Sequence, residues 1–280
     1  MRRFVLIPLL VELFLVPSFV FAQETTFPPI PSIPCVAHRG FSAFYPENTI
    51  VSALKAIEVG AQGSEFDVKC TTDGVLFLTH DPTLKRTTGL DVACDDVDFP
   101  TLAKLDAGAF KGADFKGEHV ATYDEALQTF KGTQTHPVVE IKGSGYEEKI
   151  VAYIQKYDMV SDVVIISGVK QLRKVRDLEP NVCTAVLCRY DVKKESAESI
   201  AEKVIKACNT AGTNVVDIEF HAVTPEFLKL MDDAGITVMC WTVDKPEDID
   251  RLVKIGVKSI TTNRPDLVLE ALAKYGAEKE

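Results

Sequence analysis

The stretch that decides the fold runs from residue 214 to residue 262 and reads NVVDIEFHAVTPEFLKLMDDAGITVMCWTVDKPEDIDRLVKIGVKSITT. It alternates short apolar runs, at Asn214–Phe220, Ile236–Thr242 and Lys258–Thr262, with amphipathic segments of helical length, at Pro225–Ala234 and Pro246–Ile255. Apolar runs of this length are typical of buried strands. The helical segments between them are typical of the crossover connections of a parallel sheet.

The same alternation extends through the rest of the chain. Further strands are predicted at Cys35–His38, Gly63–Val68, Val138–Ile141, Val163–Ser167 and Val182–Cys188. Further helices are predicted at Thr49–Val59, Tyr123–Lys131, Tyr146–Tyr157, Val169–Leu178, Glu195–Thr210 and Asp266–Lys274. Eight strand–helix units over about 250 residues predict an α/β fold, the TIM (β/α)8 barrel. An open doubly wound sheet is the alternative, but no Gly-rich phosphate fingerprint follows the first strand.

The alternation breaks once, between the second strand and the second helix. Residues Asp81–Ala121 contain several Gly, Asp and Lys but no complete strand–helix unit. A connection this long is usually functional or a mobile surface excursion. We predict a small insertion that lies over the mouth of the barrel.

The first 22 residues are set apart from the fold. Met1-Arg2-Arg3 precedes an apolar run that ends in Val20-Phe21-Ala22, which is typical of a secretory signal peptide. A retained membrane anchor is the alternative, but Glu12 lies within the run, and a central carboxylate opposes insertion. We therefore expect residues 23–280 to form an exported, periplasmic or secreted domain with no stable membrane insertion after cleavage.

Composition limits the partners of this domain. The chain has 280 residues and a formal net charge of −10, which argues against nonspecific nucleic-acid binding because such binding needs a basic surface. The seven cysteines are odd in number and form no CxxC motif. We expect most of them to be small core residues, and their pairing and the oligomeric state stay open.

Three carboxylates fall at the ends of two neighbouring barrel strands. Glu65 and Asp67 are two residues apart and therefore project to one face of a strand, toward the barrel interior if Phe66 packs on the helices. Glu140 is expected to reach the same region from the adjacent strand. Each pair would repel by about 4 kcal/mol at a separation of 4 Å and an effective dielectric constant of 20. The sequence predicts that they hold one divalent cation, Ca²⁺ or Mg²⁺, with salt bridges to Arg39, Lys69 and Lys142 as the alternative.

Two histidines are expected beside the carboxylates. His38 ends the first strand, and Asp73-Gly74 predicts a hairpin that brings His80 back toward the rim. A two-residue turn would place His80 opposite Asp67, and a one-residue bulge would shift this pairing to a neighbour. Two imidazoles suit general acid and base chemistry near neutral pH. Arg39 and Lys142 are positive groups suited to the oxygens of a phosphodiester.

Ordered motifs along nearly all of the predicted mature chain resemble the glycerophosphodiester phosphodiesterase family. They are His38-Arg39-Gly40, Pro46-Glu47-Asn48-Thr49, Glu65-x-Asp67, Thr72-Asp73-Gly74, His80-Asp81, Arg86-Thr87-Thr88-Gly89, Leu105-Asp106-Ala107-Gly108, Glu140-Ile141-Lys142, Trp241-Thr242-Val243 and Thr262-Asn263-Arg264-Pro265-Asp266. The resemblance implies a metal held by Glu65, Asp67 and Glu140 and a catalytic pair of His38 and His80. It also implies phosphate contacts from Arg39 and Lys142.

The activity implied by the resemblance is hydrolysis of a small-molecule glycerophosphodiester to sn-glycerol 3-phosphate and an alcohol. Trp241 is expected to line the pocket for the alcohol, with a core position as the alternative. Lysophospholipase D-like or sphingomyelinase D-like cleavage and a noncatalytic binding protein on the same barrel are the alternative functions. Asn263 departs from the Asp that is frequent in the family, and a structural turn is the favoured interpretation, with altered contacts on the glycerol or alcohol side as the alternative. For Glu47 and Asn48 helix capping is the favoured interpretation, with Asn48 as the cap residue, and contact with the site is the alternative.

Overall fold

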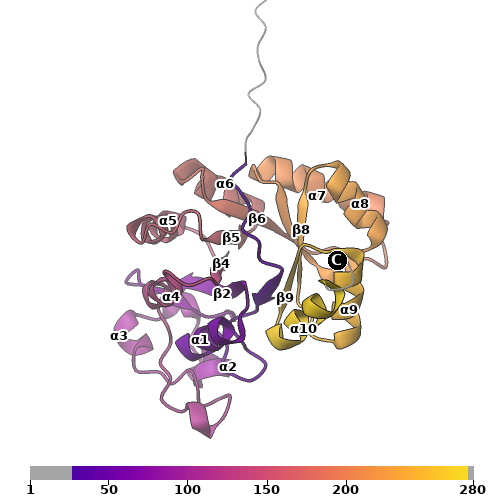
Figure 1. Ribbon diagram of the computed structural model, residues 1–280. Coiled ribbons are helices and arrows are strands. Elements are labelled where there is room, and N and C mark those ends of the chain that lie inside the picture. The colour runs from indigo at the N-terminus through magenta and orange to yellow at the C-terminus, as the bar shows by residue number, and fades with distance from the viewer. Residues whose placement is uncertain (1–26, 277–280) are drawn as a thin grey trace, which may run out of the picture.

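The computed structural model describes residues 27–276, and within them eight parallel strands close into a barrel (Figure 1). The barrel strands are β1 (Cys35–Ala37), β2 (Gly63–Cys70), β4 (His136–Ile141), β5 (Val164–Ser167), β6 (Cys183–Cys188), β7 (Val215–Glu219), β8 (Thr237–Trp241) and β9 (Ser259–Thr262). Closure is achieved because β1 pairs with β2 on one side and with β9 on the other. The predicted TIM barrel is confirmed.

Long helices follow the strands and surround the barrel (Figure 1). They are α1 (Ile50–Val59), α4 (Tyr123–Phe130), α5 (Glu147–Lys156), α6 (Val169–Leu178), α7 (Ala197–Ala211), α8 (Pro225–Asp233), α9 (Pro246–Ile255) and α10 (Pro265–Gly276). The predicted strands and helices agree with the observed ones to within two residues at each end. The agreement follows from hydrophobic periodicity, which reports directly which face of each element is buried.

Alternation along β2 separates the helix layer from the barrel interior. Phe66 is 3% exposed and its ring stacks on Phe130 of α4, with a centroid distance of 5.9 Å. Because consecutive strand residues point to opposite faces, Glu65 and Asp67 on either side of Phe66 point into the barrel. The packing of Phe66 on α4 thus orients Glu65 and Asp67 toward the barrel interior.

The hairpin that follows β2 differs in register from the two-residue turn considered above. Strand β3 (Leu76–Leu78) pairs antiparallel with β2, with Val68 opposite Leu78. Thr71 N–H donates to Val75 O, so the turn has three residues, and Gly74 adopts φ +90° in it. As a result Thr79 N–H, rather than His80, pairs with Asp67 O. The extra turn residue shifts His80 one position along the rim.

The insertion between β2 and α4 has a small apolar centre of its own. Beyond β3 it contains α2 (Lys85–Thr88), the 3₁₀ turns η1 (Cys94–Asp96) and η2 (Ala113–Phe115), and α3 (Phe99–Leu102). Its centre is formed by Phe77, Leu84, Cys94, Val97, Leu102, Ala107 and Val120. A separate apolar cluster allows this segment to hold a defined shape at the barrel mouth.

All seven cysteines lie in the described part of the chain as free thiols, and all except Cys70 are buried.

In residues 27–276 we find no helix whose length and apolarity would let it cross a lipid bilayer. The predicted signal peptide, residues 1–22, lies outside the described residues.

We expect Phe66→Ala to lower the free energy of unfolding by about 3–5 kcal/mol, because it removes a buried ring that packs between β2 and α4. Phe110→Ala, at a phenylalanine that is 38% exposed, is the matched control and should cost about 1 kcal/mol or less. Urea unfolding monitored by circular dichroism measures both. Equal losses in the two variants would contradict the assignment of Phe66 to the strand–helix core.

Candidate active site

Three carboxylates meet at the carboxyl-terminal rim of the barrel. Asp67 on β2 lies beside Glu140 on β4 in the strand register, and Glu65 lies two residues before Asp67 on the same face. One oxygen from each of the three lies within 4.8 Å of the others. Glu65 is 2% exposed and Asp67 is fully buried. The rim therefore concentrates three acidic groups, two of them buried and Glu140 partly exposed.

Two cations balance part of this charge. Arg39 Nε lies 3.3 Å from Asp67 Oδ2, and Lys142 Nζ lies 3.2 Å from Asp67 Oδ1 and 2.6 Å from Glu140 Oε1. Lys69, also considered as a partner, instead donates to the backbone oxygen of Lys142. The salt-bridge interpretation thus accounts for contacts of Asp67 and Glu140 but not for Glu65.

Glu65 is the least compensated of the three acids. The backbone N–H of Arg39 donates to Glu65 Oε2 at 2.9 Å, whereas Oε1 is buried with no hydrogen-bond partner among the described residues. Burial, Asp67 and Glu140 raise the pKa of Glu65 well above its usual range. Burial would also raise the pKa of Asp67, but Lys142 and Arg39 outweigh it and lower that pKa. An orphaned acidic oxygen beside two other carboxylates has the donor chemistry of a hard-cation site.

Asn48 supports the acidic cluster and does not cap α1. Its Nδ2 donates to Asp67 Oδ2 at 2.8 Å, and its Oδ1 accepts from Asp67 N–H at 3.1 Å. The cap of α1 is Thr49, whose hydroxyl accepts from Ser52 N–H. The capping interpretation of Asn48 was wrong by one residue. Its φ of 56° turns the side chain back toward β2, in a region that Asn tolerates better than most residues.

His38 is held by the last strand of the barrel. Its Nδ1 lies 2.8 Å from Asn263 Oδ1, and its Nε2 lies 3.9 Å from Glu65 Oε2. Asn263 Nδ2 donates to Asp244 Oδ2, which turns the amide oxygen toward His38. His38 Nδ1 is therefore the donor, and in the neutral ring Nε2 carries the lone pair that faces the carboxylates. Burial and the charge of Arg39 lower the pKa of His38 to about 4.

Asn263 is a site residue for which the sequence interpretation favoured a structural turn over contacts with the substrate. The available signal was its position: Ala37 pairs with Thr262 in the barrel, so the residues that follow these two strands, His38 and Asn263, are neighbours. The first and last strands become neighbours only because the barrel closes. The contact between His38 and Asn263 therefore depends on that closure.

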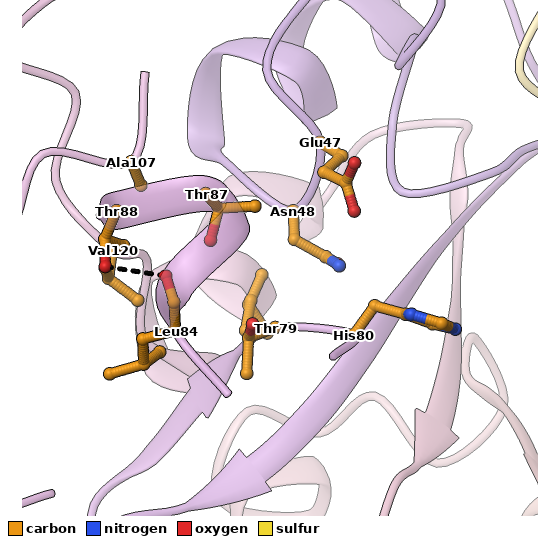
Figure 2. Close-up of a pocket in the computed structure, with 10 residues that line it drawn as sticks. Glu47, Asn48, Thr79, His80, Leu84, Thr87, Thr88, Ala107 and Val120 are labelled. Carbon is orange, nitrogen blue, oxygen red and sulfur yellow. Dashed lines mark hydrogen bonds between the residues drawn. The ribbon is translucent and has the colours of Figure 1, made fainter. Parts of the chain in front are cut away.

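His80 approaches from the insertion side of the rim. Its Nδ1 lies 2.9 Å from Asp81 Oδ1. Arg86 of α2 donates to both Asp81 and Glu47, and Glu47 also accepts from Arg39. Figure 2 shows His80 pointing away from the insertion's apolar cluster, with Glu47 on the loop that leads to α1. A chain of ion pairs thus connects the segment that carries His80 to the loop after β1.

These groups open onto one cavity of about 570 Å³ at the carboxyl ends of the strands. It is lined by His38, Arg39, His80, Glu140, Lys142, Leu187, Cys188, Arg189, Asp217, Trp241 and Thr242. This volume lies within the range of small-molecule sites. The structure brings His38, His80, Arg39, Lys142, Glu140 and Trp241 to a single cavity, with Glu65 and Asp67 buried beneath it. The lining also contains Arg189 and Asp217, which the sequence did not single out.

The chain resembles known proteins over most of its length. Residues 38–267 match the model of the Glycerophosphoryl diester phosphodiesterase family. A glycerophosphodiester phosphodiesterase of Caldanaerobacter subterraneus subsp. tengcongensis is 32% identical over 247 residues, which cover 86% of this chain and 98% of the relative. The crystal structure of a glycerophosphodiester phosphodiesterase from Agrobacterium tumefaciens str. C58 matches with a TM-score of 0.72 and 25% identity, over 85% of this chain and 99% of that chain.

An Oleispira antarctica phosphodiesterase, solved in complex with the product sn-glycerol-3-phosphate, shares the fold with a TM-score of 0.75 and 22% identity, over 86% of this chain and 96% of that chain. The fold, the matched family model and the identity to the Caldanaerobacter enzyme agree with one another. The chain therefore belongs to the glycerophosphoryl diester phosphodiesterase family, whose members hydrolyse glycerophosphodiesters.

Proposed function

We propose that this enzyme uses one divalent cation and a histidine pair to hydrolyse glycerophosphodiesters to sn-glycerol 3-phosphate and an alcohol. The single observation that carries the proposal is the buried Oε1 of Glu65, which has no hydrogen-bond partner within residues 27–276 and belongs to a cluster of three carboxylates. The other oxygen of Glu65, Oε2, lies 3.9 Å from His38 Nε2. Burying such an oxygen without a partner is costly, so the site is built for a ligand that satisfies it.

Glu65, Asp67 and Glu140 are the residues that would hold the cation. Three carboxylates supply only oxygen donors, which suits Ca²⁺ or Mg²⁺ better than zinc. When bound, the cation supplies positive charge that neutralises phosphate oxygens and stabilises the charge that develops during displacement. When all three carboxylates are ionised, their charge of −3 exceeds the +2 of Arg39 and Lys142 and leaves a net negative site for the cation.

His38 and His80 have separate supports that suit separate roles. The hydrogen bond from Nδ1 to Asn263 leaves Nε2 of His38 as an acceptor that faces the acidic cluster, which suits a general base toward the attacking nucleophile. His80 lines the same cavity and is oriented by Asp81, which suits a general acid toward the leaving oxygen. Arg39 and Lys142 line the same cavity, and in this proposal their positive groups bind the phosphate oxygens.

The cavity lining favours a small hydrophilic diester over a lysophospholipid or sphingomyelin. Eight of its eleven lining residues are charged or polar, and the other three are Leu187, Cys188 and Trp241. A long acyl chain laid against the polar groups would bury them without hydrogen-bond partners, which is costly, whereas a hydrophilic diester can pair with them.

We expect His38→Ala and His80→Ala each to lower kcat by roughly 10² to 10⁴, because each removes one proton-transfer group from the reaction. Release of glycerol 3-phosphate from glycerophosphoglycerol measures the effect. His119→Ala is the matched control, since His119 is an exposed insertion residue paired with Glu125, and it should keep the wild-type kcat. Wild-type turnover in both active-site variants would remove the proposed pair.

We expect EDTA to abolish activity and Ca²⁺ or Mg²⁺ to restore it. The cation should also raise the melting temperature, because a ligand at 100 times its Kd stabilises the folded state by about 2.7 kcal/mol. Glu65→Gln keeps the shape of the side chain and removes its charge, so it should fold, lose most activity and show no such rise. Full activity in EDTA, with no thermal shift by either cation, would contradict the metal site.

We expect Asn263→Leu to lower kcat by roughly 10- to 100-fold with little change in KM, because His38 loses the acceptor that fixes its tautomer. Asn263→Asp keeps an acceptor and should recover part of kcat, although its charge lies beside Asp244. Steady-state kinetics with melting temperatures as the folding control measure both variants. Identical kcat values in wild type and Asn263→Leu would show that the residue acts only in the turn.

A further inference from the structure

Asp217 is a buried acid in the cavity that the proposed reaction does not use. It lies in the middle of β7, beside Leu187 of β6 and Met239 of β8 in the strand register. Its residue is 2% exposed, and its Oδ1 has no hydrogen-bond partner among residues 27–276. Burial and the nearby charge of Glu140 raise its pKa well above the usual range for Asp. The carboxyl lines the cavity, where its oxygens can accept hydrogen bonds and, when it is protonated, it can also donate one.

Trp241 offers a second unsatisfied polar atom in the same cavity. It ends β8, next to Glu219 of β7, and its Nε1–H is buried with no acceptor in the described structure. An indole N–H is a donor only, so it matches a hydroxyl or another oxygen of a ligand. Together, Asp217 and Trp241 provide two hydrogen-bonding groups that a ligand with hydroxyl groups could satisfy.

Arg189 controls the charge of this part of the cavity. It follows β6, and its guanidinium carbon lies 4.9 Å from the centroid of the Trp241 ring. The face of a tryptophan ring is the surface on which a quaternary ammonium group binds best. Here that face is already covered by a cation, whose charge also repels a second one.

We propose that Asp217, Arg189 and Trp241 form a specificity subsite that favours phosphodiesters of an uncharged polyol, such as glycerol, over those of choline. This proposal rests on the proposed function and names the alcohol arm of its substrate. The hydroxyl groups of the polyol would satisfy Asp217 and the Trp241 indole, and they suffer no repulsion from Arg189. A choline arm has no hydroxyl group for these partners and carries a positive charge. A site built to bind hydroxyl groups discriminates strongly against a ligand that lacks them.

The test compares kcat/KM of the full-length enzyme for glycerophosphoglycerol and glycerophosphocholine with the cation present. We expect wild type to prefer glycerophosphoglycerol by about tenfold or more, equivalent to about 1.4 kcal/mol. Arg189→Ala should raise kcat/KM for glycerophosphocholine and bring the ratio toward one. Arg173→Ala removes an exposed arginine on α6 that is absent from the cavity lining, and it should leave the ratio unchanged.

Two substitutions at Asp217 separate hydrogen bonding from charge. Asp217→Asn removes the possible charge but keeps a side chain that accepts and donates hydrogen bonds, so it should retain the preference, whereas Asp217→Leu should lose it. If the acid instead acted as a carboxylate that binds the ammonium group, Asp217→Asn would lower the use of glycerophosphocholine, and the proposal would be overturned. Melting temperatures verify folding, and Asp217→Asn remains informative if Asp217→Leu does not fold.

The remaining outcomes distinguish this subsite from the proposed function itself. Cleavage of both diesters with equal kcat/KM, or equal losses on both in Asp217→Leu, would overturn the subsite and leave the phosphodiesterase reaction intact. Equal losses would mean that Asp217 binds the glycerol arm common to both substrates. Cleavage of neither diester, with or without cation, would overturn the proposed function and the subsite together.

Discussion

The mutual repulsion of Glu65, Asp67 and Glu140 is the constraint on which the rest of the barrel mouth depends. Strand parity and register place their oxygens within 4.8 Å of one another, where each ionised pair repels by about 4 kcal/mol at an effective dielectric constant of 20. Arg39 and Lys142 offset part of this repulsion by direct contact. The cluster thus needs a further positive group, and the same charge distribution suits an anionic phosphodiester bound through a cation.

Two residues with a left-handed backbone conformation hold the acidic side chains in place. Arg39 and Asn48 both adopt the left-handed region, with φ of 54° and 56°. Their hydrogen bonds to the acids offset the conformational cost, since Arg39 N–H donates to Glu65 and Asn48 bonds to Asp67 through both side-chain atoms. Strained residues of this kind concentrate at functional sites, because the surrounding structure must over-determine them.

The two histidines depend on different parts of the molecule. His38 is oriented by Asn263, which Asp244 holds in turn, so its geometry depends on closure of the barrel between β1 and β9. His80 is oriented by Asp81, whose partner Arg86 belongs to the insertion. The insertion therefore positions one histidine of the proposed pair, and the barrel seam positions the other.

The sequence by itself determined the barrel, its strand and helix positions, and which acids and histidines share the mouth. These follow from periodicity and strand parity, and both are local properties of the chain. Only the tertiary structure decided the three-residue turn before β3, the contact between Asn48 and Asp67, the pairing of Asn263 with His38, and the place of Asp217 and Arg189 in the cavity. Each of these depends on register or on contacts between residues far apart in the chain. Such contacts are set by the packing and closure of the whole barrel. A local sequence pattern does not predict them, because it reports only which face of each element is buried.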